Sequence, residues 1–414
     1  MLLLAAVAVP AIADPGTRPA VTRHGCNGGG DRGLYIGVTT NNVLPDDTDV
    51  VVIGLGPAGE EVAARLLDGG LQVVGVEREL VGGECPYWGC VPSKMVIRAA
   101  DALAEARRVP LLAGAADVRP DYALVARRIR DEATADWDDA LAVERLEKAG
   151  AVVVRGSAVI EERGRVRVGE RVVTARRGVV VATGSAPVRP PIPGLAEAGY
   201  WTNREAIAAR GVPESLVVLG GGAIGLELAQ AFVRFGSAVA VVEGAGRVLP
   251  MEEPEASAAV TEALRADGVA LHVGRRAVAV ARRDGQVVVT LDDGEQVVGA
   301  ELLVAVGRRP AGAGLGLERY GVAGPAVPVD GRMRAAEGLW AAGDVTGVAA
   351  FTHLAVYHAR IAAADILGGD VTPADHSALP RVTFTDPEVG SVGLTEAARA
   401  PPGSTSSPPP RPPA

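Results

Sequence analysis

The stretch DVVVIGLGPAG (residues 49–59) decides the fold, and it has a second copy in SLVVLGGGAIG (residues 215–225). In each copy a short apolar run leads into the pattern G-x-G-x-x-G, and the glycines of the second copy follow those of the first by 166 residues. The apolar run predicts a buried strand, and the residues after the glycines predict a helix. We therefore predict two strand–turn–helix units that arose as an internal repeat.

Each predicted unit continues into a second strand that ends on an acidic residue. Residues 71–76 lead to Glu77 and residues 238–242 lead to Glu243, and each acid lies 23 residues after the first glycine of its copy. One such glycine pattern among 53 glycines is weak evidence, whereas two in the same context predict two dinucleotide sites. In each site the glycines allow a tight turn, a close approach to pyrophosphate and close helix packing; they are Gly54, Gly56 and Gly59, and Gly220, Gly222 and Gly225.

The acid at the end of each second strand predicts which nucleotide binds. A carboxylate at Glu77 or Glu243 accepts a hydrogen bond from a ribose 2′-OH and repels the 2′-phosphate of NADP, so NAD is expected. Arg247 lies four residues beyond Glu243 and keeps NADP as an alternative. The other alternative is a pair of such units that bind no nucleotide.

Composition narrows the function further. The 414 residues are enough for two or three domains, and 41 Lys and Arg against 50 Asp and Glu give a net charge of −9, which argues against a nucleic-acid partner. No run reaches the roughly 18 apolar residues that a membrane span needs. The start, MLLLAAVAVPAIA (residues 1–13), resembles a signal peptide without its basic region. We interpret it as part of an unstructured leader and expect a cytoplasmic protein, with secretion as the alternative.

The chemical centre is GGECPYWGCVPSK (residues 82–94), which holds two of the three cysteines. On a regular helix Cys85 and Cys90 would be separated by about 7.5 Å of rise, farther than a disulfide allows, but Pro86 and Gly89 permit irregular backbone between them. A helix that starts nearby would lower a thiol pKa. We predict a pair for reversible oxidation; zinc ligands or two inert thiols are the alternatives. No metal is expected.

Together, the two fingerprints, the cysteine pair, ATGSAP (residues 182–187) and LWAAGD (residues 339–344) resemble the pyridine nucleotide–disulfide oxidoreductases. This flavoprotein group includes dihydrolipoamide dehydrogenase, glutathione reductase and mercuric reductase, and the resemblance covers roughly residues 49–398. It implies FAD in the first unit and NAD(P)H in the second. The FAD residues it implies are Gly54, Gly56, Gly59, Glu77, Thr183, Gly184, Gly343, Asp344 and Thr352, and the NAD(P)H residues are Gly220, Gly222, Gly225, Glu243 and Gly307.

The resemblance also implies roles in catalysis. Cys90 is expected against the flavin and Cys85 is expected to exchange with a disulfide or dithiol substrate. Lys94, one of only two lysines in the chain, is expected to pair with Glu227 near the flavin. An ammonium there stabilises the charge that develops when the ring accepts a hydride, and a carboxylate keeps a buried ammonium charged.

Two departures from the family pattern affect these expectations. Between the cysteines, Tyr87 and Trp88 replace the small residue and the Asn of the family pattern. The sequence also has no second cysteine pair, and this absence argues against mercuric reductase. Residues 379–396 resemble the opening of the family's dimerisation domain, but the match then gives way to a proline-rich tail without the expected His–Glu pair. We therefore expect impaired dimerisation, and keep a diaphorase or quinone-reducing flavoprotein and a non-catalytic FAD-binding remnant as alternatives.

These observations predict an α/β fold with two Rossmann-like dinucleotide-binding domains, a discontinuous FAD domain and the remnant of an α+β dimerisation domain. The predicted order is an unstructured leader (1–48), the first part of the FAD domain (49–186) with a helical insertion (95–148), the NAD(P) domain (187–310), the second part of the FAD domain (311–375), the truncated dimerisation domain (376–398) and a disordered tail (399–414).

Overall fold

The first glycine turn follows a central strand of a mainly parallel sheet. The structure is a computed structural model that describes residues 44–399. The chain divides into two units, residues 1–39 and 40–414, and every described residue belongs to the second. Nearly all of the predicted leader and tail lie outside the described residues. Strand β1 (Asp47–Ile53) begins two residues before the predicted start of the FAD domain.

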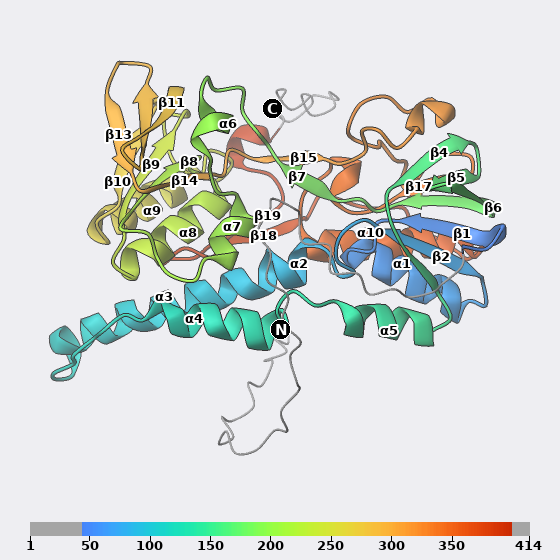
Figure 1. Cartoon of the computed structure of the whole chain (residues 1–414), viewed down its shortest axis with the longest axis horizontal. Helices are drawn as coiled ribbons and strands as arrows, with labels where there is room; N and C mark the ends of the chain where they lie inside the picture. The colour runs from blue at the N-terminus through green and yellow to red at the C-terminus, as the bar shows by residue number, and fades with distance from the viewer. Residues whose placement is uncertain (1–43, 400–414) are drawn as a thin grey trace. The chain divides into compact units, whose positions relative to one another are not determined.

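The first sheet has the strand order β16-β17-β6-β1-β2-β3 (Figure 1). Two further strands branch from this order, since β5 pairs with β6 and β4 pairs with β5. Strands β1, β2, β3, β6 and β17 pair in parallel, and β16 pairs antiparallel with β17. Residues 334–341 thus return to the first sheet, which makes this sheet discontinuous in the chain. Its elements are β1, α1 (Pro57–Asp68), β2 (Val73–Glu77), β3 (Val152–Arg155), β4 (Ala158–Glu162), β5 (Arg165–Val168), β6 (Arg171–Val181), β16 (Arg334–Ala336), β17 (Leu339–Ala341) and α10 (Thr352–Ile366), which packs against α1.

The second sheet repeats the arrangement around the second glycine turn. Its four parallel strands have the order β10-β9-β8-β14, and a three-stranded antiparallel sheet, β11-β12-β13, follows β10 in the chain. These elements are β8 (Ser215–Leu219), α8 (Ala223–Arg234), β9 (Ala238–Glu243), α9 (Pro254–Ala266), β10 (Ala270–Val273), β11 (Ala277–Arg283), β12 (Gln286–Leu291), β13 (Gln296–Gly299) and β14 (Glu301–Val304). The α/β class and the Rossmann-like parallel strands agree with the prediction.

The helical stretch between β2 and β3 packs on both sheets. Its elements are α2 (Glu84–Tyr87), α3 (Cys90–Leu112), α4 (Tyr122–Arg128), the π-helix η1 (Ile129–Ala133) and α5 (Ala140–Lys148). The buried residues Val96, Ala100 and Val125 share a core with α8, whereas Val143 and Leu146 of α5 share a core with the first sheet. The apolar residues of α5 therefore pack on the first sheet, whereas those of α3 and α4 pack on α8 of the second.

Two short strand pairs complete the described chain. Strands β7 (Ser185–Pro187) and β15 (Arg308–Pro310) pair antiparallel where the chain passes between the two sheets, close to the predicted domain boundaries. Strands β18 (Pro380–Thr383) and β19 (Val389–Val392) form the last pair. The remaining elements are α6 (Leu195–Ala198), α7 (Asn203–Ala208) and the 3-10 turns η2 (Leu317–Tyr320), η3 (Asp344–Thr346) and η4 (Glu396–Ala398).

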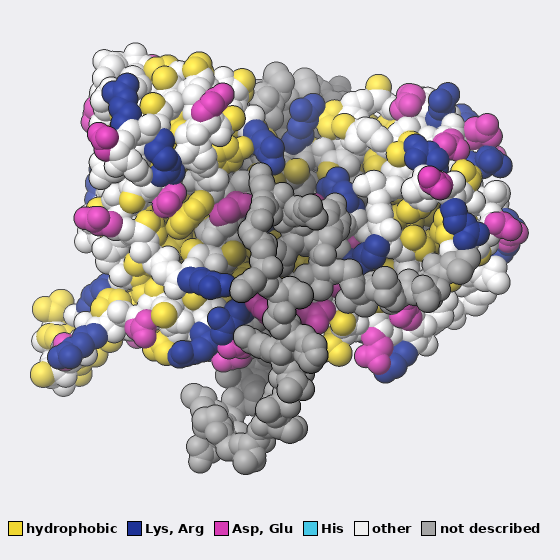
Figure 2. All heavy atoms as spheres, viewed as in Figure 1, with side chains coloured by type: hydrophobic (Ala, Val, Ile, Leu, Met, Phe, Trp, Pro, Cys, Tyr) yellow, Lys and Arg dark blue, Asp and Glu magenta, His cyan; other side chains and the backbone are white. Residues whose placement is uncertain are grey.

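The surface shown in Figure 2 carries positive and negative side chains side by side. Apolar side chains gather at the far end of α3, where Leu111 and Leu112 are more than four-fifths exposed (Figure 2). Among residues 44–399, every helix is too short or too polar to cross a bilayer.

Candidate active site

The two glycine turns make the same close contacts in the two sheets. Gly54 and Gly220 both have positive φ, +90° and +107°. A Cβ on Gly54 would lie 2.6 Å from the Ala182 carbonyl oxygen, and one on Gly220 would lie 2.4 Å from that of Ala305. Glycine is therefore required at the first position of each turn for both conformation and space.

The third glycine of each turn permits the helix to approach the strand. A Cβ on Gly59 would lie 1.9 Å from the Gly54 carbonyl oxygen, and one on Gly225 would lie 2.1 Å from that of Gly220. In contrast, no described heavy atom lies within 4 Å of a Cβ placed on Gly222. The second glycine therefore faces open space, as a phosphate-binding turn requires.

The Glu77 carboxylate holds the first turn in place. Its Oε2 accepts a hydrogen bond from the Leu55 N–H at 2.7 Å, and its Oε1 accepts one from the Glu79 N–H at 2.7 Å. Burial raises the pKa of Glu77, and the two backbone N–H groups oppose this shift. The acid expected to bind ribose therefore also fixes the backbone of the glycine turn.

The second copy repeats these hydrogen bonds. Glu243 accepts from the N–H groups of Gly221 and Ala245, both at 2.6 Å. Arg247, which kept NADP open as an alternative, directs its guanidinium to the backbone carbonyls of residues 249–250 at 3.2 and 3.1 Å. The second turn therefore presents the Glu243 carboxylate, while the Arg247 guanidinium nearby is already bound to backbone carbonyl groups.

A cavity of about 710 Å³ brings together most of the predicted FAD and catalytic residues. The predicted residues that line it are Gly54, Gly56, Glu77, Cys85, Cys90, Lys94, Thr183, Gly184, Glu227, Gly343, Asp344 and Thr352. Those that do not line it are Gly59, Gly220, Gly222, Gly225, Glu243 and Gly307. All of the latter except Gly59 were predicted for the nicotinamide coenzyme, so the cavity corresponds to the first of the two predicted sites.

The two cysteines lie on either side of a break between helices. Cys85 belongs to α2, and Cys90 is the first residue of α3, with Trp88 and Gly89 between the helices. Both cysteines are free thiols in this structure and hydrogen bond to each other, and Cys90 Sγ lies 3.3 Å from Thr352 Oγ1. The irregular backbone that the spacing required is therefore present.

The surroundings shift the pKa values of the two thiols in opposite directions. The hydrogen bond from Cys85, with further contributions from Thr352 and the Lys94 ammonium, lowers the pKa of Cys90 to about 6 against the effect of burial. The same hydrogen bond, together with burial, raises the pKa of Cys85. The surroundings therefore favour the thiolate at Cys90, the residue at the N-terminus of a long helix, over the thiolate at Cys85.

Lys94 and Glu227 form the predicted pair. Lys94 Nζ lies 2.9 Å from Glu227 Oε2, and the Glu227 side chain is 9% exposed. The pair joins α3 to α8, helices that are far apart in the chain and pack against each other. A positive charge is thereby held at the wall of the cavity.

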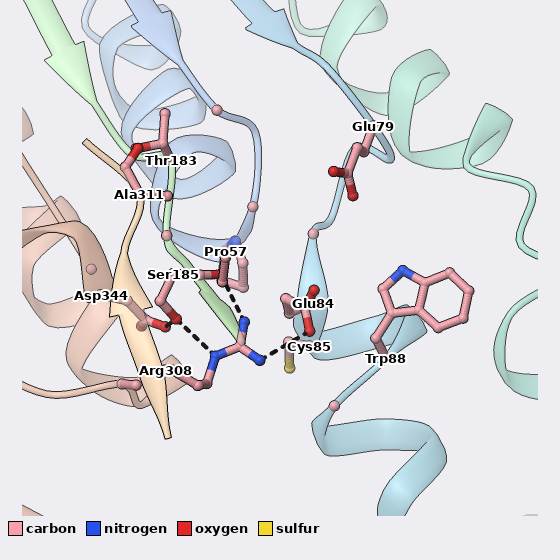
Figure 3. Close-up of a pocket in the computed structure, with 18 of the residues that line it drawn as sticks. Pro57, Glu79, Glu84, Cys85, Trp88, Thr183, Ser185, Arg308, Ala311 and Asp344 are labelled. Carbon is pink, nitrogen blue, oxygen red and sulfur yellow. Dashed lines mark hydrogen bonds and ion pairs between the residues drawn. The ribbon is translucent and has the colours of Figure 1, made fainter. Parts of the chain in front are cut away.

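Sequence reasoning missed a polar chain across the cavity, which Figure 3 shows from Asp344 to Glu84. Ser185 Oγ donates to Asp344 Oδ2 at 2.6 Å, and Arg308 Nε donates to Ser185 Oγ at 2.8 Å. Arg308 Nη1 lies 3.6 Å from Glu84 Oε2. Burial raises the pKa of Asp344, while the Ser185 hydroxyl and Arg308 oppose this shift. The turn at residues 307–310 was the available signal for Arg308.

Trp88 and Arg204 were also missed as cavity residues. The rings of Trp88 and Trp137 stack with centroids 5.2 Å apart, and the Arg204 guanidinium carbon lies 5.6 Å from the centroid of the Trp88 ring. Arg204 Nε donates to Glu84 Oε1 at 2.7 Å. These contacts fix the wall next to Cys85, and among the described residues no group of three or more His, Cys, Asp or Glu could hold a metal there.

A buried histidine supports the loop before Asp344. His358 is fully buried, its Nδ1 accepts a hydrogen bond from the Gly343 N–H at 3.3 Å, and its Nε2 lies 2.8 Å from His376 Nε2. Because Nδ1 is an acceptor, Nε2 carries the proton and donates to His376. Burial lowers the pKa of His358 to about 4, and His376 contributes to this shift.

This lowered pKa predicts acid sensitivity. The unfolded chain takes up a proton at His358 below the ordinary pKa of about 6.5, whereas the folded protein does so only near 4, so stability falls with decreasing pH across this window. We expect His358 to account for a loss of about 2 kcal/mol in the free energy of unfolding between pH 7 and pH 5. Urea denaturation of the wild type and of His358→Asn at the two pH values measures it. His272→Asn, which alters a histidine whose side chain is 21% exposed, is the control. Equal pH dependence in wild type and His358→Asn would contradict the expectation.

Comparisons with known proteins find a matching family and several relatives. The model of the family described as pyridine nucleotide-disulphide oxidoreductase matches residues 48–359. A mercuric reductase of Acidithiobacillus ferrooxidans is 37% identical over 359 residues, which cover 84% of this chain and 65% of that protein. A dihydrolipoyl dehydrogenase of Chlorobaculum tepidum is 36% identical over 371 residues, which cover 86% of this chain and 78% of that one. This chain thus spans less than two thirds of the first relative.

A solved structure shares the fold. The Cu(II) complex of the HOCl-induced flavoprotein disulfide reductase RclA from Escherichia coli superimposes with a TM-score of 0.76 at 28% sequence identity. The superposition covers 85% of this chain and 78% of that one.

Proposed function

Because this chain belongs to the pyridine nucleotide–disulphide oxidoreductase family, we propose that it is an FAD-dependent NADH:disulfide oxidoreductase similar to dihydrolipoyl dehydrogenase. One observation supports the proposal: Cys85 and Cys90 line one cavity together with Lys94 and the first glycine turn, and their surroundings lower the pKa of Cys90. The predicted family is confirmed by the comparisons, whereas the substrate and the roles of the single residues remain proposals.

The cavity has the features that FAD needs. Gly54 and Gly56 leave room at the N-terminus of α1, whose first residues Pro57 and Ala58 also line the cavity, so the helix dipole can stabilise a pyrophosphate there. Buried Asp344 offers a carboxylate for hydroxyl groups. We infer that these residues hold FAD. When bound, FAD supplies a carrier that takes two electrons from NADH and passes them to the cysteines.

The cysteines complete the proposed reaction with a disulfide substrate. The Cys85 sulfur attacks one substrate sulfur after losing its proton, the substrate S–S bond breaks, and the first thiol leaves protonated. The Cys90 thiolate then attacks the Cys85 sulfur, which forms the Cys85–Cys90 disulfide and releases the second substrate sulfur as a thiolate that takes one proton from solvent. The hydride equivalent of NADH restores the Cys85 thiol and the Cys90 thiolate. In sum, NADH, one proton and R–S–S–R give NAD⁺ and two R–SH.

Reduction of a quinone or dye is a second candidate. Among residues 44–399 no histidine lines the cavity, so the described residues offer no imidazole there for proton exchange with a dithiol. A quinone or dye acceptor requires only flavin and NADH. Assays with a disulfide and with a dye on the same preparation distinguish the two activities.

The test of the proposal is a steady-state assay of the FAD-loaded protein with NADH or NADPH and with lipoamide, oxidised glutathione, Hg²⁺ or a quinone as acceptor. We expect one FAD per chain, lipoamide reduction, and kcat/KM for NADH at least about fivefold above that for NADPH, because a carboxylate and a phosphate at close range repel by about 1 kcal/mol or more. Absence of FAD, or oxidation of NADH with no disulfide reduced, would contradict the proposal.

Substitution of Glu243 and of Glu77 distinguishes the roles of the two proposed nucleotide sites. Glu243→Gln keeps a side-chain acceptor for one of the two backbone N–H groups and removes the negative charge. The ratio of kcat/KM for NADH to kcat/KM for NADPH is therefore expected to fall. Glu77→Gln makes the same change in the first turn and is the matched control, since it leaves the ratio of kcat/KM for the two coenzymes unchanged. If NADPH serves the wild type as well as NADH, the role of Glu243 is wrong.

A further inference from the structure

A third group completes the Lys94–Glu227 pair. The Lys94 Nζ lies 4.2 Å from the centroid of the Phe384 ring, and the Phe384 N–H donates to Glu227 Oε1 at 2.9 Å. Lys94 occupies the other carboxylate oxygen, Oε2, at 2.9 Å. Glu227 thus holds the ammonium and the backbone of Phe384, while the phenyl ring covers the ammonium from another side.

Phe384 is itself fixed by contacts of the residues that follow it. The Asp386 N–H donates to Gln230 Oε1 at 2.7 Å, and Gln230 Nε2 donates to the Asp386 carbonyl at 2.9 Å. Arg234 Nη2 lies 2.7 Å from Asp386 Oδ2. Glu227, Gln230 and Arg234 follow one another at helical spacing on one face of α8, and all three are buried. Residues 384–386 are therefore held on this helix at three successive positions.

The placement of the ring matters because Lys94 is partly exposed. Its side chain is 36% exposed, so the ion pair with Glu227 alone leaves this long, flexible side chain free to adopt other rotamers. An aromatic face attracts an ammonium through the ring quadrupole and removes water from one side of it. The same ammonium lies one helical turn after Cys90 and contributes to holding that residue as a thiolate.

We propose that Phe384 is a positioning residue, whose ring holds the Lys94 ammonium at the cavity wall and so sets the charge felt by the Cys90 sulfur and by the FAD that the proposed function requires. The β18–β19 segment, remote in sequence from the cysteine motif, thereby becomes part of the redox centre. The inference rests on the proposed function, but its first test needs neither coenzyme turnover nor substrate.

The first test replaces Phe384 by phenylalanines with one, two and three ring fluorines, which weaken the negative face of the ring with little change in size. The protein is reduced with dithiothreitol, and iodoacetamide alkylation of Cys90 is followed by mass spectrometry against pH. We expect the pH of half-maximal alkylation to rise in steps with each fluorine, by about 0.5 unit in total. A merely structural role predicts no such series, and an unchanged midpoint through all three would overturn the proposal.

The second test measures the rate at which NADH reduces the flavin in the FAD-loaded protein. Phe384→Leu keeps the backbone N–H bond to Glu227 but loses the aromatic face, and we expect an about fivefold slower reduction, with Phe384→Tyr restoring the wild-type rate. If Phe384→Leu loses FAD, the fluorinated series provides the rate comparison. A wild-type protein that NADH does not reduce refutes the proposed function, whereas a normal rate in Phe384→Leu refutes only the role of Phe384.

Discussion

Replacement of Cys90 by serine is expected to abolish disulfide reduction, with kcat falling by about 10³-fold or more, while FAD binding and NADH-dependent dye reduction persist. A serine hydroxyl is not ionised near neutral pH, so it can neither carry the thiolate charge nor form the disulfide that releases the second product. In the wild type, Cys85, Thr352 and Lys94 lower the pKa of the Cys90 thiol, which favours its thiolate. Assays of lipoamide and dye reduction on one preparation check the expectation.

The matched control for Cys90→Ser is Thr352→Ala. Thr352 Oγ1 lies 3.3 Å from the same sulfur and contributes to its low pKa, so its loss is expected to shift the pH dependence of disulfide reduction upward without abolishing it. A Cys90→Ser enzyme that still reduces lipoamide at the wild-type rate would exclude the thiol mechanism. Loss of dye reduction as well would show that the substitution had damaged the flavin site.

Gly222→Ala is expected to have the second largest effect, a rise of about 100-fold in the KM for NADH at unchanged FAD content. The added methyl group meets no described heavy atom within 4 Å, so the fold is unaffected, but it occupies the space through which the second turn would approach a pyrophosphate. About 100-fold in affinity corresponds to about 2.8 kcal/mol. Steady-state dye reduction at varied NADH concentration measures the change.

Gly56→Ala is the corresponding change in the first turn and is expected to reduce FAD content instead. Its Cβ would lie 3.8 Å from the Gly83 Cα, an ordinary van der Waals contact, so it too is compatible with the fold. The two variants therefore assign one nucleotide to each turn. Equal NADH affinity in wild type and Gly222→Ala would mean that the second turn does not bind the coenzyme.

Local and repeated features were predictable from the sequence. The strands around both turns lie within a few residues of prediction, and a helix follows each turn as expected. The glycines, the apolar strands and the acid are close in the chain, and each has a steric or hydrogen-bonding reason for its position. The Lys94–Glu227 contact was also expected, although only through resemblance to the family. Its observed length of 2.9 Å places the two groups together but does not test their roles.

Contacts between distant segments could not be predicted from local patterns. The apolar residues of α3 and α4 indicated helices but not the partner they cover, which is α8 rather than the first sheet. Arg308 reaches the cavity because β15 pairs with β7, and its sequence context showed only a turn. Phe384 contacts Lys94 across 290 positions of the chain. Such contacts depend on the tertiary fold.

Counting thiols before and after NADH tests the central claim most directly. The air-oxidised, FAD-loaded protein is treated anaerobically with one equivalent of NADH, alkylated under denaturing conditions and analysed by mass spectrometry. If NADH delivers its two electrons to the cysteine pair, Cys85 and Cys90 are protected from alkylation before NADH is added and become alkylated afterwards, and this change requires bound FAD. Cysteines that are both alkylated before NADH is added, or both still protected after NADH has reduced the flavin, would contradict the account.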